Sequence, residues 1–453
     1  MGGRSKYTLV FLQSMVHGCQ RQPIWIAPMN RQNQSRYLLV LLLAALLMPL
    51  AVVETSAATE SAESSANPDL RTRSALTGDW WGARTWLADH GLNLDLRHTS
   101  FYQGLASGTG DKDFEYGGKL DAFINLDSGK MGLWEGGGFR SHLEYRHGDA
   151  PANLGGAIFA ANTALYWPVD TPEKLVATSL YFNQKVGDRS SIALGKFNPV
   201  DLLAADPFYG GWGIDRFMSL VLAAPPSGLV PVVFMGAVAN IQTKPASWTI
   251  MVFDPNDRTN DYFSGDLFED GVNISVGGAH LTTLSGRKTT YAATAIYSTA
   301  DGADYSSIGS GVVGTSTKSG SYNISFEFKH NLQESSHDPN AAWGFYVKAA
   351  FADGNPNYVR RSLIVGIGGR ALFFGRPQDS FGVGAYLYDL SDTLQDSLDP
   401  TRTNFHNEGG LEVFYSFWVT PWLQIGADIQ YINPARGDYK NALIPSLRTQ
   451  IRF

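Results

Sequence analysis

The sequence LQIGADIQY, residues 423–431, alternates apolar and polar residues without a break. Successive side chains of a β-strand point to opposite faces, so this segment predicts a strand with one apolar and one polar face. The apolar face carries Leu423, Ile425, Ala427, Ile429 and Tyr431, and the polar face carries Gln424, Gly426, Asp428 and Gln430. Such a strand is typical of a membrane barrel, with lipid on one side and a wet lumen on the other.

The same alternation recurs from residue 91 to Phe453, most clearly in residues 323–329 and 443–453. A half-buried sheet of a soluble protein also alternates, but the apolar faces here stay clean over about ten residues, as in barrel strands. The pattern therefore predicts an all-β transmembrane antiparallel barrel of sixteen strands, an even number as bacterial barrels have. The strands are expected near 91–103, 115–127, 137–147, 176–187, 190–197, 230–242, 246–253, 271–282, 288–299, 320–331, 342–351, 361–372, 380–389, 408–419, 422–433 and 443–453.

The connections between these strands alternate in length, which is the pattern of short periplasmic turns and long external loops. The short turns are 187–189, 243–245 and 420–421; the long loops are 148–175, 198–229, 254–270, 300–319 and 390–407. This alternation places both ends of the barrel chain on the periplasmic side. Beyond Val53 no apolar stretch approaches the roughly 20 residues of a spanning helix. A membrane protein without such helices must be a closed barrel.

The composition agrees with a barrel. Aromatic residues make up 12% of the chain, glycines number 48 and charged residues only 17%, whereas soluble domains carry about 25% charged residues. The net charge of −7 argues against a nucleic-acid partner, since such proteins show a basic excess or patch.

Residues 1–58 are expected to be a leader that is removed. Within 29–58, two arginines precede the apolar run 37–53, and Ser56-Ala57-Ala58 follows as a small-residue cleavage site, as in a secretory signal peptide. A transmembrane anchor is the alternative for the apolar run, and a lipoprotein signal ending at Cys19 is an alternative for the region before it. Met29 is a candidate for the true start. Residues 59–75 are expected to be a flexible leader, and residues 76–453 the barrel domain.

Residues 76–90, LTGDWWGARTWLADH, do not alternate and predict a short periplasmic helix that plugs or braces the barrel rim. Thr77 is the expected N-cap. The expected apolar side of this helix carries Trp80, Trp81, Ala83, Trp86 and Leu87. At the other end, the terminal aromatic Phe453 resembles the sorting signal of outer-membrane proteins, which implies recognition by the barrel-assembly machinery.

Charged side chains on the lumen face of the first three strands are the candidate solute-contacting residues. Sugars are neutral and covered with hydroxyls, and charge-assisted hydrogen bonds to them are the stronger ones. Hydration of a wide lumen alone would also place charges there. The candidates on these strands are Asp95, Arg97, Lys119, Asp121, Arg140, His142, Glu144 and Arg146. The loop 198–229 adds Asp206, Trp212 and Asp215, expected to fold into the pore and constrict it or to pack against its wall.

An enzyme is disfavoured. There is no G-x-S-x-G motif, and none of the nine histidines has a recognisable catalytic partner motif. No catalytic residue, cofactor, metal cluster or phosphate loop is predicted. The acidic stretch Asp254-Pro255-Asn256-Asp257 suggests calcium, but a turn is the preferred interpretation.

Several stretches resemble one family, the OprB-type carbohydrate-selective porins of Gram-negative bacteria. The most specific is GKFNPVDLLAADPFYGGWGIDRFMSL, residues 195–220, continued by APPSGLVP at 224–231; others lie at 77–84, 87–91, 162–168, 420–423 and 430–434. The resemblance covers about residues 76–453. It implies a sixteen-stranded outer-membrane barrel narrowed by inward-folded loops, with passive uptake of monosaccharides such as glucose and no cofactor.

The function expected from the sequence is therefore passive diffusion of small sugars into the periplasm. A general porin for small hydrophilic solutes shares every barrel feature and is the main alternative. A soluble secreted sugar-binding protein is a third, and would show fewer clean lipid faces. A homotrimer is compatible with a large porin.

Overall fold

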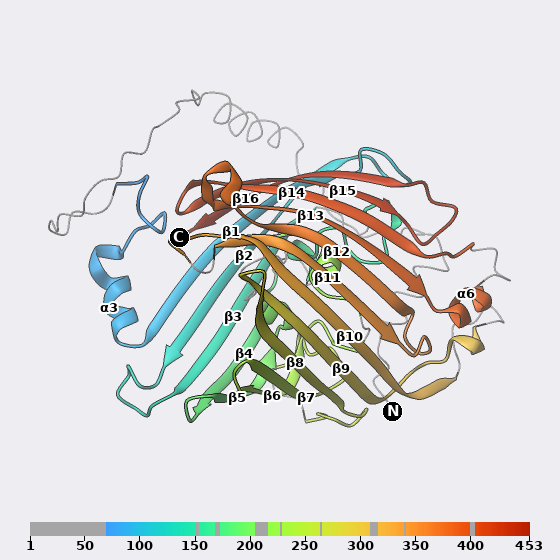
Figure 1. The fold of residues 1–453 in the computed structure, drawn as a ribbon, viewed down its shortest axis with the longest axis horizontal. Helices are drawn as coiled ribbons and strands as arrows, with labels where there is room; N and C mark the ends of the chain where they lie inside the picture. Colours follow the sequence, from blue (N-terminus) through green and yellow to red (C-terminus); the bar gives the residue numbers. More distant parts are fainter. Residues whose placement is uncertain are drawn as a thin grey trace. The chain divides into compact units, whose positions relative to one another are not determined.

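The computed structural model describes residues 69–149, 154–167, 173–203, 216–226, 229–262, 265–308, 316–338, 341–398 and 404–453. Its sixteen strands each pair antiparallel with their neighbours in sequence, and β1 pairs with β16, which closes the barrel (Figure 1). The predicted barrel and strand number are confirmed. The strands are β1 Leu92–Gly104, β2 Phe114–Asp127, β3 Gly137–Gly148, β4 Leu175–Val186, β5 Ser190–Phe197, β6 Phe234–Gln242, β7 Ala246–Phe253, β8 Asn273–Leu284, β9 Arg287–Ala303, β10 Thr317–Glu334, β11 Ala342–Ala352, β12 Val359–Ala371, β13 Arg376–Leu390, β14 Glu408–Thr420, β15 Leu423–Asn433 and β16 Ala442–Arg452.

Some strands extend past their predicted ends. β9 and β10 run several residues beyond the alternating segments and stay paired across a register shift between Ser319 and Ser321. A bulge of this kind carries pairing past a point where strict alternation fails, so the sequence pattern underestimated this hairpin.

The two faces of the strands differ as predicted. On β15, Ile429 is 52% exposed, whereas its neighbour Asp428 on the inner face is 3% exposed. Apolar residues on the outer faces of many strands are similarly exposed, among them Leu194, Ile250, Val276, Ile324, Phe326, Val365, Leu387, Val413 and Leu447. A soluble protein rarely exposes a continuous apolar surface of this extent, so the outside of the barrel fits lipid. No described helix is both long and apolar enough to cross a membrane.

A short helix precedes the first strand, as predicted, but its start differs. The 3₁₀ turn η1, Trp80–Gly82, leads into α3, Ala83–Asp89, whose N-cap is Gly82 in the left-handed conformation. Thr77 is not the cap, because its hydroxyl accepts a hydrogen bond from the Trp80 ring nitrogen. The expected apolar side is also not packed, since Trp81 is 96% exposed and Trp86 58% exposed.

The N-terminal segment is attached to the end of the chain. The Leu76 amide donates to the Arg452 carbonyl (2.8 Å), and Arg84 Nη2 donates to the backbone oxygen of Phe453 (2.6 Å). The described part of the expected flexible leader, 69–75, also contacts the barrel, because Trp422 Nε1 donates to the Leu70 carbonyl. α3 lies at one end of the strands, and α6, Asp392–Leu398, at the other (Figure 1). The expected signal and cleavage site lie outside the described residues.

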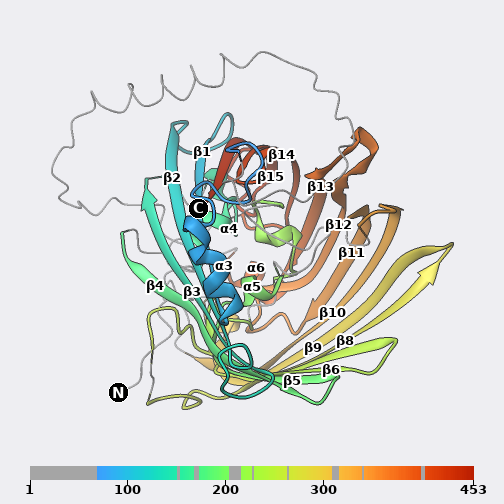
Figure 2. The ribbon, with the colours of Figure 1, turned by 90° about the vertical axis from the view of Figure 1, so that its left-hand side faces the viewer.

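Two connections fold into the barrel. The first inner loop, residues 154–167, contains η2, Leu154–Gly156, and α4, Thr163–Tyr166. The second inner loop, described at 198–203 and 216–226, contains α5, Pro199–Leu203, and η3, Leu220–Leu222. Figure 2 shows α4 and α5 inside the ring of strands. Together they build a small interior core on Phe101, Ala164, Leu165, Val200, Met218 and Ala223.

Two further 3₁₀ turns connect strands. η4, Tyr305–Ser307, follows β9, and η5, Leu372–Phe374, joins β12 to β13.

Candidate functional site

Four of the candidate residues form one buried charge network on the inner wall of β2 and β3. Lys119 Nζ lies 2.9 Å from Glu144 Oε2 and 3.2 Å from Asp121 Oδ1. His142 Nε2 lies 3.0 Å from the same Asp121 oxygen. The residues face one another across the β2–β3 pair, where Asp121 is directly opposite Glu144. The single ammonium of Lys119 balances one of the two carboxylate charges, which lowers the cost of burying them.

The network also holds the second inner loop. His142 Nδ1 lies 2.9 Å from Asp201 Oδ1 on α5, and the Ser179 hydroxyl donates to the other oxygen of Asp201 (2.6 Å). Thr178 donates to Glu144 Oε1 (2.6 Å). Charged hydrogen bonds between a wall and a loop fix the position of the loop more strongly than neutral ones.

Burial separates these residues from solute. Asp121 and Glu144 are 0% exposed, Lys119 2% and His142 3%. They face the interior of the barrel, as predicted, but they lie beneath the second inner loop. Asp121, His142 and Glu144 are also residue types that ligate metals and lie close together. Asp121 Oδ1, His142 Nδ1 and both Glu144 oxygens already contact Lys119, Asp201 or Thr178, so the arrangement is that of an anchor.

Arg146 attaches the first inner loop in a similar way. Its guanidinium lies over the Tyr166 ring of α4, 4.8 Å from the ring centre, and the Arg146 side chain is buried. Burial raises the pKa of the Tyr166 hydroxyl above its usual range, although the charge of Arg146 acts in the opposite direction. The tyrosine therefore stays neutral and packs as an aromatic partner of the arginine.

The remaining candidates on the wall do reach open space. Arg140 is exposed, and Asp95 and Arg97 are half-buried. Arg97 Nη2 lies 2.5 Å from Asp95 Oδ2, and its guanidinium lies 5.5 Å from the centre of the Phe123 ring. Phe123 in turn stacks on His142 at 4.0 Å. These contacts join Asp95 and Arg97 to the buried network and hold the two charges in fixed positions.

A second anchor, formed by β14 and β16, was not predicted from the sequence. Glu412 on β14 accepts hydrogen bonds from the backbone amides of Met218 (2.5 Å) and Ser219 (3.1 Å). On β16, Arg448 Nη1 donates to the Arg216 carbonyl (3.0 Å). No pattern in the sequence pairs Glu412 with a loop about two hundred residues away in the chain.

The small residues of β13 make room for this contact. A Cβ atom at Gly382 would lie 2.7 Å from the Phe217 ring, and one at Gly384 would lie 3.0 Å from both Phe217 and Leu222. On β11, the Tyr346 hydroxyl donates to the Leu222 carbonyl (2.9 Å), and Lys348 Nζ donates to the Ala223 carbonyl. The second inner loop is therefore fastened to both sides of the barrel.

The two inner loops also bind one another. Thr163 donates to the Met218 carbonyl from its amide (3.1 Å) and from its hydroxyl (2.8 Å). The first loop is joined to the wall by Gln430, whose amide donates to the Ala161 carbonyl (2.7 Å). The loops thus form one structure across the interior, which narrows the lumen.

Three candidate residues, Asp206, Trp212 and Asp215, lie outside the described residues. The suspected calcium segment forms a turn around Arg258. Asp254 is buried and binds Arg258 at 2.9 Å, and Asp261 and Asp266 contact the same guanidinium. Burial opposes the charge of Arg258, but the hydrogen bonds that its guanidinium donates to Asp254 raise the pKa of Arg258 above its usual value.

Comparisons with known proteins agree with this architecture. Residues 111–453 match the family described as carbohydrate-selective porin, OprB family. OprB of Pseudomonas putida, in a structure determined at high pH, superposes with a TM-score of 0.71 and 18% identity, covering 84% of this chain and 99% of that chain. Its low-pH structure gives a TM-score of 0.54 and 15% identity over the same shares. A direct comparison with curated protein sequences finds no match.

At these identities the two structures support the fold, and the family match supports the identity. The matched family is one of porins, so the protein transports solutes and is not an enzyme. The chain belongs to the OprB family of carbohydrate-selective porins, outer-membrane barrels through which sugars diffuse passively.

Proposed function

We propose that this porin passes monosaccharides such as glucose, and that Asp95, Arg97 and Arg140 supply the solute contacts on the β1–β3 wall. The observation that carries the proposal is the narrowing of the lumen by two inner loops beside exposed side chains of both charge signs. Sugar hydroxyls both donate and accept hydrogen bonds, so a wall with carboxylate and guanidinium groups offers partners for each.

The four buried network residues act differently in this proposal. Lys119, Asp121, His142 and Glu144 position the second inner loop, and their contribution to selectivity passes through the loop. Asp206, Trp212 and Asp215 belong to the same loop and are proposed to complete the narrow zone.

A general porin for small hydrophilic solutes is the alternative. The wall opposite β1–β3 also carries mixed charges, with Glu327 lying 2.9 Å from Lys329 and 3.2 Å from Lys348. Adjacent opposite charges favour a neutral polyol over either an anion or a cation. This supports a carbohydrate-selective pore over a general porin.

Solute flux through the purified protein in liposomes tests the proposal. Glucose is expected to enter faster than amino acids of similar size, and Arg140→Ala is expected to reduce that preference. Equal flux of all small solutes would identify a general porin. If no solute enters the liposomes, the protein is not a channel.

Assembly is a further part of the proposal. We propose that Phe453 is recognised by the barrel-assembly machinery and that the barrels associate as a homotrimer. Native mass measurement of the detergent-solubilised protein distinguishes a trimer from a monomer. Phe453→Ala is expected to lower the amount of folded, heat-modifiable barrel in the outer membrane, and an unchanged amount would exclude the sorting role.

A further inference from the structure

A cavity of about 360 Å³ lies at the end of the barrel that holds α3 and Phe453. Its walls come from the N-terminal segment (Ser74, Ala75, Arg84), from β1 and β2, and from Arg452. This volume lies at the lower end of the range for small-molecule pockets, about 300–1,000 Å³. The cavity is at the opposite end of the barrel from α6, and it shares Asp95 with the wall charges that contact the buried network through Arg97 and Phe123.

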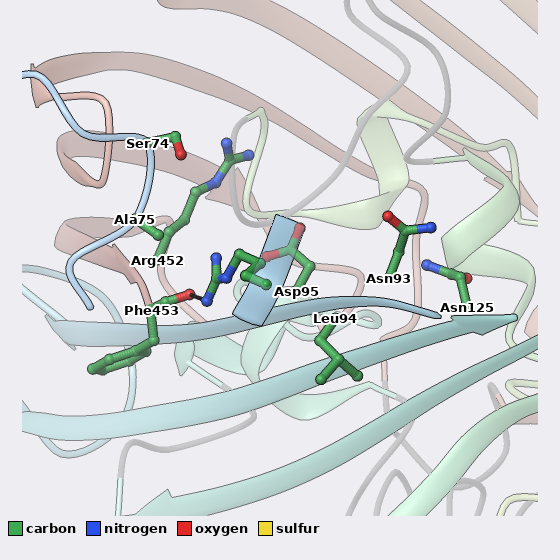
Figure 3. A pocket seen from close by; sticks show the side chains of 9 residues that line it. Ser74, Ala75, Asn93, Leu94, Asp95, Asn125, Arg452 and Phe453 are labelled. Carbon is green, nitrogen blue, oxygen red and sulfur yellow. Dashed lines mark hydrogen bonds between the residues drawn. The ribbon is translucent and has the colours of Figure 1, made fainter. Parts of the chain in front are cut away.

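Two amide side chains stand next to each other in this cavity. Asn93 on β1 is directly opposite Asn125 on β2 in the strand register. Figure 3 shows both amides and Asp95 on one side of the β1 ribbon, with the side chains of Leu94 and Phe453 on the other. Among the described residues, no side-chain hydrogen bond is formed by Asn93 or Asn125. Two adjacent amides thus offer donors and acceptors that no protein group uses.

The neighbouring charged groups are held in place. Arg97 binds both oxygens of Asp95, at 3.1 Å from Nε and 2.5 Å from Nη2, yet the Asp95 side chain stays 41% exposed. Arg84 is fixed by its hydrogen bond to the Phe453 backbone oxygen. Fixed polar groups lose little conformational freedom when a ligand binds, which favours binding.

We propose that this cavity is a second saccharide subsite, which a monosaccharide occupies as it leaves the narrow zone. This inference rests on the proposed function. The Asn93–Asn125 pair binds neighbouring hydroxyls of the sugar, each amide donating to one and accepting from another, and Asp95 accepts from a third. The lining holds Asp95 together with Arg84 and Arg452, so charges of both signs stand beside the two amides and offer a neutral polyol both acceptors and donors.

A single-cysteine reporter tests the subsite in the full-length protein. Ser74→Cys, made in a Cys19→Ser background, places one thiol at the cavity edge without removing either amide. The rate of its reaction with a bulky maleimide is measured with increasing glucose. Occupancy slows the reaction by a factor of 1 + [sugar]/Kd, so about tenfold at a sugar concentration roughly ten times Kd. Ser325→Cys on β10, in the same background, reports on a position of the wall away from the cavity.

Saturable protection of the Ser74→Cys thiol by glucose, absent at Ser325→Cys and lost with added Asn93→Ala or Asn125→Ala, is the expected result. Protection by inorganic phosphate but not by glucose would show that the cavity binds an anion, and would overturn the saccharide subsite. If glucose still enters liposomes faster than amino acids of similar size but does not protect the thiol, the subsite is overturned and the porin function stands. Absence of sugar preference in flux would instead count against the proposed function.

Discussion

His142 of β3 and Asp201 of α5 lie 59 residues apart in sequence, and their side chains meet at 2.9 Å inside the barrel. This hydrogen bond links the wall charge network to the loop that narrows the lumen. Pore width in this protein therefore depends on side chains that solute does not reach.

Asp201→Ala is expected to release α5 from the wall. The change removes the closest partner of His142 Nδ1 and the acceptor of the Ser179 hydroxyl, and a buried group that loses its hydrogen bond costs about 1–3 kcal/mol. Single-channel conductance should rise and the unfolding temperature should fall. Asp438→Ala, which breaks an exposed pair with Arg436, is the matched control and should change neither. An unaltered conductance in Asp201→Ala would show that the loop is held elsewhere.

Gly382→Ala should displace the second inner loop from β13. The added methyl group would lie 2.4 Å from the Phe414 ring and 2.7 Å from the Phe217 ring. Overpacking of this kind costs about 1–3 kcal/mol. Thermal unfolding and current noise in planar bilayers measure the effect. Gly265→Ala serves as control, because a Cβ there meets nothing within 4 Å. Equal noise in the two variants would contradict the packing argument.

Arg140→Ala removes an exposed positive charge from the wall, and the pore should become more selective for cations. One charge at about 4 Å contributes about 1 kcal/mol in water, which corresponds to a change of roughly fivefold in the permeability ratio. Reversal potentials in a salt gradient measure this ratio. Arg189→Ala removes the same charge from the short turn after β4, and a shift as large as that of Arg140→Ala would refute the assignment.

Acid should loosen the loop that follows β9. Hydrogen bonds from Asn355 and Ser306 lower the pKa of Asp304 below its usual value. The folded state favours the ionised Asp304 carboxylate. Its contribution to stability is therefore complete above the pKa that Asp304 has in the unfolded chain, and is lost as the pH falls through the lower pKa of the folded protein. Hydrogen exchange at the Ser306 amide, corrected for its intrinsic rate, should quicken in strong acid. Asp304→Asn should remove most of this pH dependence, and a dependence equal to that of the unaltered protein would exclude Asp304 as its source.

The alternation of apolar and polar residues was enough to predict the barrel, since lipid and water on opposite faces impose the same period on every strand. It also placed Lys119, Asp121, His142 and Glu144 on the inner face. It did not reveal that these side chains are covered, because the covering residue, Asp201, comes from a loop without periodicity. Thr77 was wrongly expected to cap a helix, since a left-handed glycine at residue 82 starts that helix later.

The anchors of the second inner loop set an order on assembly. The loop follows β5, but its partners Glu412 and Arg448 belong to β14 and β16, near the end of the chain. Until those strands join the barrel, the Met218 and Ser219 amides lack the carboxylate that satisfies them. A barrel that still lacks β14 and β16 holds the loop through β3, β4 and β11, and the narrow passage takes its final form only when the last strands join the wall.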